Sequence, residues 1–193
     1  PGSAHGRYAG SCHHRQHWWR LPRTYCGTAR ADSTMIAFDI DGVLADVRHR
    51  LPLLNVRPKR WQEFFEAAAF DEPLHEGLAV VSTLAQHSAI VYVTGRPESN
   101  RALTRDWLQR HGFPGAALHM RRAGDRRPGA QMKSELLALL GGPRVVSSVY
   151  DDDVDVVTRL RADGYHVEHV TWMPLAVAEQ GTLFDAQENL GLT

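Results

Sequence analysis

The chain has 193 residues, of which 43% are hydrophobic and 23% are charged, a composition that fits one globular domain with its own core. Its 22 basic and 22 acidic side chains cancel, so no overall charge draws it to nucleic acid or to an anionic membrane. No apolar run reaches the roughly 20 residues that a transmembrane helix needs, so we expect no membrane partner.

Residues 1–34 differ from the rest, because they mix Gly, Arg, His and Trp without the period of a helix or a strand. Both cysteines, Cys12 and Cys26, lie here, but their spacing matches no standard zinc pattern. The segment also lacks the apolar core of a secretory signal. We therefore expect a poorly ordered tag or linker, followed by a cysteine-free domain over residues 35–175 with a cytoplasmic location. Residues 176–193 are expected to form a C-terminal tail.

From Met35 onward, short apolar runs alternate with segments of helical period. The segments rich in Val, Ile and aromatic residues predict five strands, at 35–38, 89–93, 117–120, 145–150 and 166–172. The segments of helical period predict five helices, at 61–69, 74–87, 99–110, 132–140 and 153–163. The expected fold class is α/β, a three-layer sandwich with a five-stranded, mainly parallel, Rossmann-like sheet and helices on both faces.

Polar and charged residues follow four of the five expected strands. In chain order they are Asp39 and Asp41, then Thr94, Gly95 and Arg96, then Arg121, Arg122 and the later Lys133, and finally Asp151, Asp152, Asp153 and Asp155. Ligands of such sheets bind beyond the carboxyl ends of the strands. Because those ends meet at one edge of the sheet, we expect these side chains to form one site.

The chemistry of this site follows from its charges. Acids gathered in a partly dry pocket repel one another, and a hard divalent cation such as Mg²⁺ relieves the repulsion. Lys133, Arg96 and Thr94 then offer positive charge and a hydroxyl group to a second anion. A metal ion and cationic donors around one anion are the arrangement that phosphoryl transfer needs. An aspartate there can act as nucleophile through a phospho-aspartyl intermediate, and a second carboxyl group can act as general acid and base.

At these residues the sequence resembles phosphatases of the haloacid dehalogenase (HAD) superfamily. The segments FDIDGV (38–43), VTGRP (93–97) and VYDDDVD (149–155), with Lys133 before the last, follow the order of the four motifs of that superfamily. The resemblance covers nearly all of residues 35–172. Receiver domains of response regulators carry similar residues, but their phospho-acceptor follows a middle strand, whereas the Asp-x-Asp pair comes first here.

The resemblance implies a role for each motif residue. Asp39 would be the nucleophile and Asp41 the general acid and base. Thr94 would bind the phosphoryl group, and Lys133 would hold both that group and the nucleophile. The implied ligands of Mg²⁺ are Asp39, Asp41 through its backbone carbonyl, Asp151 and Asp152, with Asp155 in support.

Within the superfamily, the sequence is similar to the 3′-phosphatase domain of polynucleotide kinase–phosphatases. The similarity rests on Arg50, eleven residues past the expected nucleophile, and on the segments TGR (94–96), TRDWL (104–108) and MRRAGDRRPGAQMK (120–133). It implies that Arg50 and Arg96, with Gly95, bind the substrate at the scissile phosphate or its neighbour.

The chain also departs from that group. An acid often stands four residues before the motif lysine, where this chain has Gly129, so the ionic support of Lys133 is either missing or supplied elsewhere, with Asp125 as the candidate. The phosphate-binding loop G-x-x-x-x-G-K-[ST] of a kinase half does not occur in the sequence.

Three further features concern the substrate. The Arg-rich segments 47–60 and 121–133 lie at the expected active-site edge and suit a phosphate backbone. The interval between the first two expected strands is too short for a full cap domain, so the site would be open to the end of a macromolecule, or covered by a second copy in a homodimer. Trp61 is expected to pack its helix, and base stacking by its ring is the alternative.

The function that combines these features is a Mg²⁺-dependent phosphomonoesterase resembling a polynucleotide 3′-phosphatase, with the 3′-phosphate ends of DNA or RNA as substrates. One alternative keeps this chemistry but takes small substrates such as mononucleotides or sugar phosphates. A second alternative is an inactive phosphate-binding regulatory module, against which the intact Asp39, Lys133 and Asp151 argue.

Overall fold

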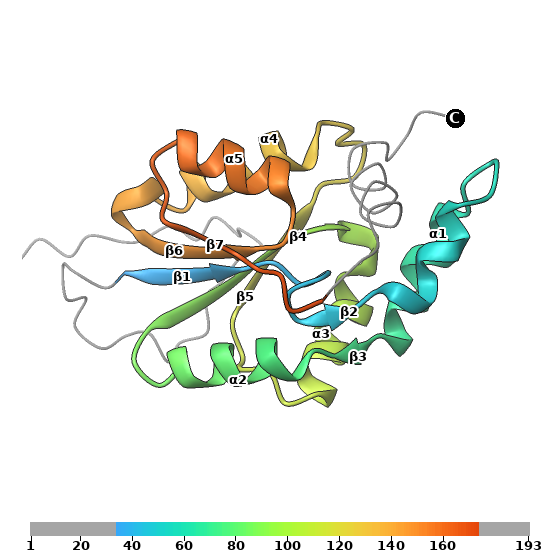
Figure 1. Ribbon diagram of the computed structural model, residues 1–193, viewed down its shortest axis with the longest axis horizontal. Coiled ribbons are helices and arrows are strands. Elements are labelled where there is room, and N and C mark those ends of the chain that lie inside the picture. The colour runs from blue at the N-terminus through green and yellow to red at the C-terminus, as the bar shows by residue number, and fades with distance from the viewer. Residues whose placement is uncertain (1–33, 174–193) are drawn as a thin grey trace, which may run out of the picture. The chain divides into compact units, whose positions relative to one another are not determined.

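The computed structural model describes residues 34–173 (Figure 1), so the expectations for the residues before and after this range lie outside the described part. Five strands form one sheet in the order β5-β4-β1-β6-β7, and every pair of neighbours is parallel. The strands are β1 (Met35–Phe38), β4 (Ala89–Pro97), β5 (Ala117–Arg121), β6 (Val146–Asp151) and β7 (Val167–His169). The predicted five-stranded α/β fold is therefore confirmed, with a fully parallel sheet.

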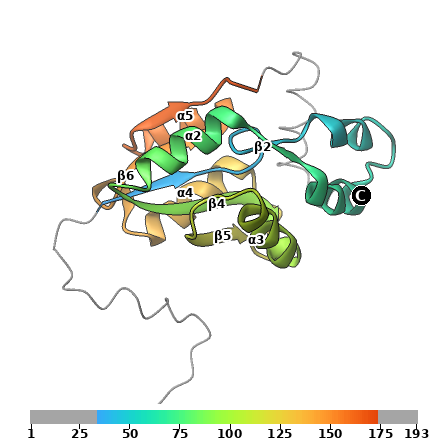
Figure 2. The same cartoon turned by 90° about the horizontal axis from the view of Figure 1, so that it is seen from below.

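Helices cover both faces of the sheet and complete the three layers (Figures 1 and 2). One face carries α4 (Gly129–Leu139) and α5 (Val154–Ala162), and the other carries α2 (His75–Leu84) and α3 (Arg101–Arg110). In the described residues, no helix is both long enough and apolar enough to cross a membrane.

The central strand β1 explains why its sequence is apolar without alternation. Its side chains point alternately to the two faces, because successive residues of a strand face opposite ways. Phe38 joins one core cluster together with Trp107 of α3, while Ala37 joins another together with Leu137 of α4. Since both faces are buried, every position after Met35 in this strand must be apolar.

A small lobe fills the interval between β1 and α2. The short strands β2 (Ala45–Asp46) and β3 (Glu72–Pro73) pair in antiparallel fashion at its base. Between them lie η2 (Arg48–Leu54), α1 (Trp61–Glu66) and η3 (Ala67–Phe70). The lobe has its own apolar cluster, which includes Leu51, Phe64 and Phe65. It is too small to be a full cap domain, as the sequence predicted.

Some boundaries differ from the expected ones. The helix α4 begins at Gly129, three residues before the expected start, so Lys133 lies inside the helix and does not open it. The predicted helix 61–69 is α1 continued by the tighter η3. The strand pair β2–β3 and the helix η2 were not predicted, because strands of two residues carry no periodicity and Pro52 inside η2 argues against a helix.

Two leucines of α4 test the packing of this core. Leu137 is fully buried, while Leu139 in the same helix is 76% exposed. We expect Leu137→Ala to lower the free energy of unfolding by about 2–5 kcal/mol, because it removes buried methyl groups and leaves a cavity. The matched Leu139→Ala should change it by less than about 0.5 kcal/mol. Urea denaturation of both variants measures the difference, and equal effects would contradict the arrangement described.

Candidate active site

The carboxyl edge of the sheet brings three distant residues into direct contact. Asp39 directly follows β1, Asp151 ends the neighbouring β6, and Lys133 reaches the same edge from α4. The Lys133 ammonium lies 2.7 Å from Asp39 Oδ2 and 2.7 Å from Asp151 Oδ2. Each of these residues is only 1% exposed, so the three charges interact away from bulk water.

A third acid completes a cluster with the geometry of a metal site. Carboxylate oxygens of Asp39, Asp151 and Asp152 all lie within 4.8 Å of one another. With Lys133 beside them, the ionised cluster carries two net negative charges, which a divalent cation would balance. Asp152 Oδ1 is buried and has no hydrogen-bond partner among the described residues, so it has lone pairs available for a cation. Oxygen donors of this kind are those that Mg²⁺ prefers, and the residues therefore fit Mg²⁺.

The acids of this cluster bind protons more tightly than ordinary carboxylates. Burial raises the pKa of Asp151 to about 7, although Lys133 opposes the rise. Burial also raises the pKa of Asp39 and places the pKa of Asp152 well above its usual range. The pKa of Lys133 rises, because Asp151 and Asp39 outweigh the effect of its burial. A cation must therefore displace protons from this cluster near neutral pH.

The glycine of the Asp-x-Asp-Gly motif allows the cluster to close. Gly42 has φ +77°, a conformation that residues with a Cβ rarely adopt. A Cβ at this position would lie 1.9 Å from Asp152 Oδ2. Only glycine therefore lets the turn after β1 approach Asp152.

The two remaining acids of the fourth motif lie outside the cluster. Asp153 caps the N-terminus of α5, where its Oδ1 accepts hydrogen bonds from the backbone N–H groups of Asp155 at 2.8 Å and Val156 at 3.3 Å. The side chain of Asp155 is exposed and is not among the clustered acids, so the expected support from Asp155 is not found.

A second buried cluster lies around Asp41. Asp41 Oδ1 accepts hydrogen bonds from Arg50 at 2.7 Å and from Arg96 at 2.6 and 2.8 Å. Asp71 binds the same two guanidinium groups, at 2.8 and 2.9 Å from Arg50 and 2.7 Å from Arg96. Two arginines and two acids thus balance in charge. The Nη1 nitrogen of each arginine is buried and has no hydrogen-bond partner among the described residues, so this nitrogen can donate hydrogen bonds to an anion.

The arginines decide the protonation of Asp41. Burial alone would raise the pKa of this carboxyl group, but Arg50 and Arg96 outweigh it and lower the pKa to about 2. Asp41 is therefore an ionised carboxylate near neutral pH while both arginines hold it. Its side chain is not one of the clustered metal-ligand candidates, so its expected part in metal binding, through the backbone carbonyl, stays a prediction.

Asp71 is the residue of this site that the motifs did not identify. It lies in the lobe just before β3 and is 1% exposed. His49 Nε2 lies 2.9 Å from its Oδ1, and Trp107 Nε1 donates a hydrogen bond to its backbone carbonyl at 2.7 Å. The sequence held only an indirect sign of Asp71. Two arginines at a buried edge need two negative charges to balance them, and Asp41 supplies only one.

The C-terminal end of β4, which contains Thr94, Gly95 and Arg96, lies at the same edge, as expected. Thr94 is fully buried, and its hydroxyl accepts a hydrogen bond from the backbone N–H of Arg96 at 3.3 Å. The carbonyl of Gly95 accepts a hydrogen bond from Arg121 Nε at 3.3 Å. Arg121 also donates to the backbone carbonyl of Arg127 at 2.7 Å, so it braces the loop between β5 and α4. Arg121 is 2% exposed, so it is a buried support of this loop.

Several other basic residues of the two Arg-rich segments form ion pairs with acids. Arg48 pairs with Asp46 at 2.5 Å, and Arg60 pairs with Glu63. Asp125 pairs with Arg127 at 2.7 Å, while the ion-pair partners of Lys133 are Asp39 and Asp151. The expectation that Asp125 supports Lys133 is therefore wrong.

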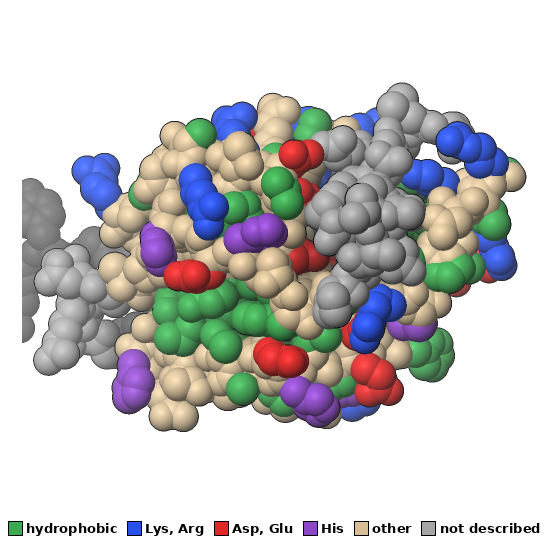
Figure 3. Space-filling view, in the orientation of Figure 1, with side chains coloured by type: hydrophobic (Ala, Val, Ile, Leu, Met, Phe, Trp, Pro, Cys, Tyr) green, Lys and Arg blue, Asp and Glu red, His purple; other side chains and the backbone are tan. Residues whose placement is uncertain are grey.

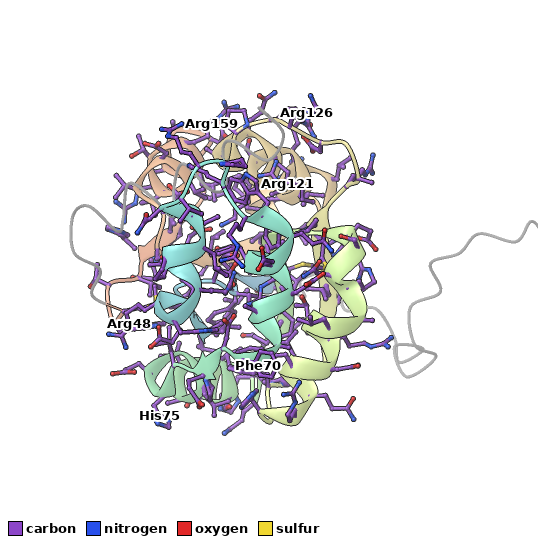
Figure 4. All side chains as sticks on the ribbon, turned by 90° about the vertical axis from the view of Figure 1, so that its right-hand side faces the viewer. Arg48, Phe70, His75, Arg121, Arg126 and Arg159 are labelled. Atoms are coloured by element: carbon purple, nitrogen blue, oxygen red, sulfur yellow. The ribbon has the colours of Figure 1, made fainter. Side chains whose placement is uncertain are left out.

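Arg57, Arg122 and Arg126 of these segments are exposed as well, but they take no part in these ion pairs. Figure 4 places Arg126 and Arg48 toward opposite edges of the view onto the lobe. On the face drawn in Figure 3, basic side chains are dispersed and form no continuous band. A wide electrostatic track for a duplex is therefore not seen on that face.

Addition of Mg²⁺ tests the carboxylate cluster. Saturating Mg²⁺ should raise the Tm of the wild-type protein by roughly 5–10 °C, because it binds the folded state alone. The rise should be larger at pH 8 than at pH 6, since protons compete for Asp151, whose pKa is about 7. Asp152→Asn should reduce the rise, whereas Asp155→Asn, an exposed neighbour, should keep it. Differential scanning fluorimetry measures these shifts, and an undiminished rise in Asp152→Asn would contradict the assignment.

Substitution of Asp71 tests the arginine cluster. Asp71→Asn should lower the free energy of unfolding by about 3–5 kcal/mol, because two buried guanidinium groups lose half of their countercharge. Asp106→Asn is the control, since Asp106 is 65% exposed and its ion pair with Arg105 is long, at 3.7 Å. Denaturant unfolding compares the two variants. If Asp71→Asn loses as little free energy of unfolding as the control, Asp71 does not balance the charge of the two arginines.

Comparisons with known proteins agree with the fold and the motifs. A family model described as the phosphatase domain of polynucleotide kinase PNKP matches residues 33–172. A comparison with curated proteins found no match.

Solved structures show similarity in fold alone. A chain of the Pnkp1/Rnl/Hen1 RNA repair complex is 22% identical with a TM-score of 0.58, and the match covers 78% of this chain and 48% of that one. The chain thus spans about half the length of that protein. The class C acid phosphatase from Bacillus anthracis is 16% identical with a TM-score of 0.55, over 86% and 76% of the two chains. A HAD-like hydrolase from Streptococcus pneumoniae is 12% identical with a TM-score of 0.53, over 78% and 90%.

The family match covers most of the sequence and includes all four motifs described above. It carries the identification, because the solved structures are too distant in sequence to do so. The chain belongs to the family of PNKP phosphatase domains within the HAD superfamily, and it is a hydrolase of phosphoric monoesters.

Proposed function

We propose that this protein removes the phosphate group from 3′ ends of DNA or RNA, in a Mg²⁺-dependent reaction with a phospho-aspartyl intermediate on Asp39. The observation that carries this proposal is that Asp39 lies in the carboxylate cluster while its near neighbour Asp41 lies in the arginine cluster. Lys133 and two further acids surround its carboxylate, and Asp41, two residues on, is held by Arg50 and Arg96.

The first step begins at the free oxygen of Asp39. Its Oδ2 is bound by Lys133, while its Oδ1 is buried without a hydrogen-bond partner among the described residues and can attack phosphorus. Mg²⁺, held by Asp39, Asp151 and Asp152, would offset the negative charge of the nucleophile and the phosphoryl group. The bond from phosphorus to the 3′ oxygen breaks as the bond to Asp39 forms, and Asp41 gives a proton to the leaving oxygen.

The second step restores the enzyme. Water attacks the phospho-aspartate, Asp41 takes a proton from it, and inorganic phosphate leaves with the Asp39 carboxylate free again. Lys133 holds Asp39 throughout and limits its movement between the two steps. The unpartnered Nη1 groups of Arg50 and Arg96 are suited to bind phosphoryl oxygens.

The same arginines can prepare Asp41 for its role. A general acid must carry a proton, yet Arg50 and Arg96 keep the pKa of Asp41 at about 2 in the free protein. A bound phosphate group would compete with Asp41 for both guanidinium groups. Their hold on Asp41 would weaken, so its pKa would rise and a proton would become available once substrate is present.

Two observations favour a polynucleotide end over a small phosphomonoester. The lobe between β1 and α2 is short, so it leaves the site without a full cap domain that would enclose a small molecule. The family model that matches is that of a polynucleotide kinase phosphatase domain. The exposed Arg57, Arg122 and Arg126 would contact the phosphates of a strand entering the site.

Comparison of three substrates tests the proposal. We expect kcat/KM to be highest for a 3′-phosphorylated oligonucleotide and at least tenfold lower for a 3′-mononucleotide, since each contact with a neighbouring phosphate adds affinity. It should be lowest for a 5′-phosphorylated oligonucleotide, because the proposed enzyme acts on 3′ ends. Phosphate release measures all three rates. A mononucleotide that reacts as well as the oligonucleotide would refute the substrate class.

The matched controls for this assay are Asp39→Asn and Asp155→Asn. Asp39→Asn should lose more than about 10³-fold in kcat, because the amide cannot act as nucleophile. Asp155→Asn should retain activity, since its side chain is exposed and lies outside the cluster. Turnover that persists in a pure, folded Asp39→Asn preparation would overturn the role of Asp39.

A further inference from the structure

A cleft with a volume of about 560 Å³ lies between α1 of the lobe and the start of α3. Figure 4 looks onto the lobe with α3 beside it. Two aromatic rings line one wall of the cleft, and a turn of the chain with a leucine lines the other. The residues that matter are Trp61 and Phe65 on the first wall and Pro97, Ser99, Asn100 and Leu103 on the second.

The cleft borders the segment that carries Arg96. Pro97 directly follows Arg96, one of the two arginines that hold Asp41. The side-chain amide of Asn100 donates a hydrogen bond to the backbone carbonyl of Phe65 at 2.7 Å, which fixes one wall against the other. The wall of the cleft at Pro97 is therefore one residue along the chain from an arginine that is proposed to bind the phosphate.

A series of aromatic rings leads from the second arginine to the same cleft. The guanidinium group of Arg50 lies 4.2 Å from the ring centroid of Phe64. The Phe64 ring meets Phe65 edge to face, with centroids 5.3 Å apart, and Phe65 lies nearly parallel to Trp61, at 6.1 Å and 20°. The Trp61 side chain is half-buried and lines the cleft, with Lys59 Nζ 5.7 Å from its ring centroid.

These features select the kind of ligand. A flat aromatic wall suits a planar group, and the amide oxygen of Gln62 and the hydroxyl of Ser99 at the cleft can accept hydrogen bonds from its edge. The amide nitrogen of Gln62 donates a hydrogen bond to Glu66, which also lines the cleft, at 2.8 Å. The cation of Lys59 next to the ring suits a group that is carried on an anionic backbone. A nucleobase joined to a phosphate meets all of these conditions, and stacking on an aromatic ring does not depend on the identity of the base.

We propose that this cleft binds a nucleobase of the strand whose 3′ phosphate lies at Arg50 and Arg96, with Trp61 as the stacking residue. The inference rests on the proposed function, because it requires a polynucleotide substrate. It assigns to Trp61 a contact with the substrate in addition to its packing against Phe64 and Phe65. The subsite would distinguish a strand with bases at its end from one without them.

The experiment uses two oligonucleotides that both carry a 3′ phosphate and differ only in whether the last two nucleotides have bases or are abasic. Wild-type protein should prefer the base-bearing substrate in kcat/KM. Trp61→Ala should reduce that preference about 5- to 100-fold, mainly through KM, because stacking on the ring is lost. Trp61→Phe should retain most of it, since an aromatic face remains.

Two more variants guard against effects on folding. Phe70→Ala is the matched control, because Phe70 is an aromatic residue of the same lobe that is 77% exposed and does not line the cleft. It should leave the preference unchanged. Ser99→Leu fills the cleft from the opposite wall at an exposed position, and it should reduce the preference as Trp61→Ala does.

The outcomes separate the two proposals. If wild-type protein hydrolyses both oligonucleotides equally well, or if Trp61→Ala and Ser99→Leu slow both substrates to the same extent, the stacking subsite is refuted while the proposed function stands. If wild-type protein hydrolyses neither oligonucleotide but releases phosphate from small esters, the proposed function fails and the subsite fails with it.

Discussion

The contact of one buried ammonium group with two buried carboxylates holds the site together. Lys133 lies 2.7 Å from both Asp39 and Asp151, and it thereby joins α4 to the ends of β1 and β6. Without this cation the acids would face one another in a region of low dielectric constant, where like charges repel strongly. The charge that remains is negative and local, and it explains why a chain with no net charge can still attract a divalent cation at one point.

The arginine cluster also consists of buried charges that lie beside opposite charges, but here the positive and negative charges are equal in number. Arg50 and Arg96 are buried, and Asp41 and Asp71 supply equal and opposite charge. Among the described residues, one nitrogen of each guanidinium group has no hydrogen-bond partner, which is the basis for the proposed binding of phosphate. Asp41 belongs to this cluster through its side chain, although it is only two residues from Asp39 in the carboxylate cluster. The Asp-x-Asp spacing therefore assigns each acid to a different electrostatic environment.

Sequence reasoning predicted those parts of the molecule that carry a periodic pattern or a motif. The five strands were predicted because a strand buried on both faces is continuously apolar, and the contacts of Lys133 were expected because the motif order places it near Asp39. Asp71, in contrast, lies in a short lobe without periodicity, and only the packing of that lobe brings it to Arg50. Asp125 was assigned to the wrong partner, because Arg127, two residues away, is nearer than any distant lysine. Local pairing of this kind cannot be read from a count of charges.

The long sequence separation of the contacting groups has a consequence for the newly made chain. Arg96 and Asp41 are 55 residues apart, and Lys133 and Asp39 are 94 residues apart, so the site consists of non-local contacts. Contacts of this type form late in folding, because the entropy of closing long loops must be overcome first. A nascent or partly unfolded chain therefore holds these groups far apart. The site that acts on phosphate esters exists only in molecules that have completed their folding.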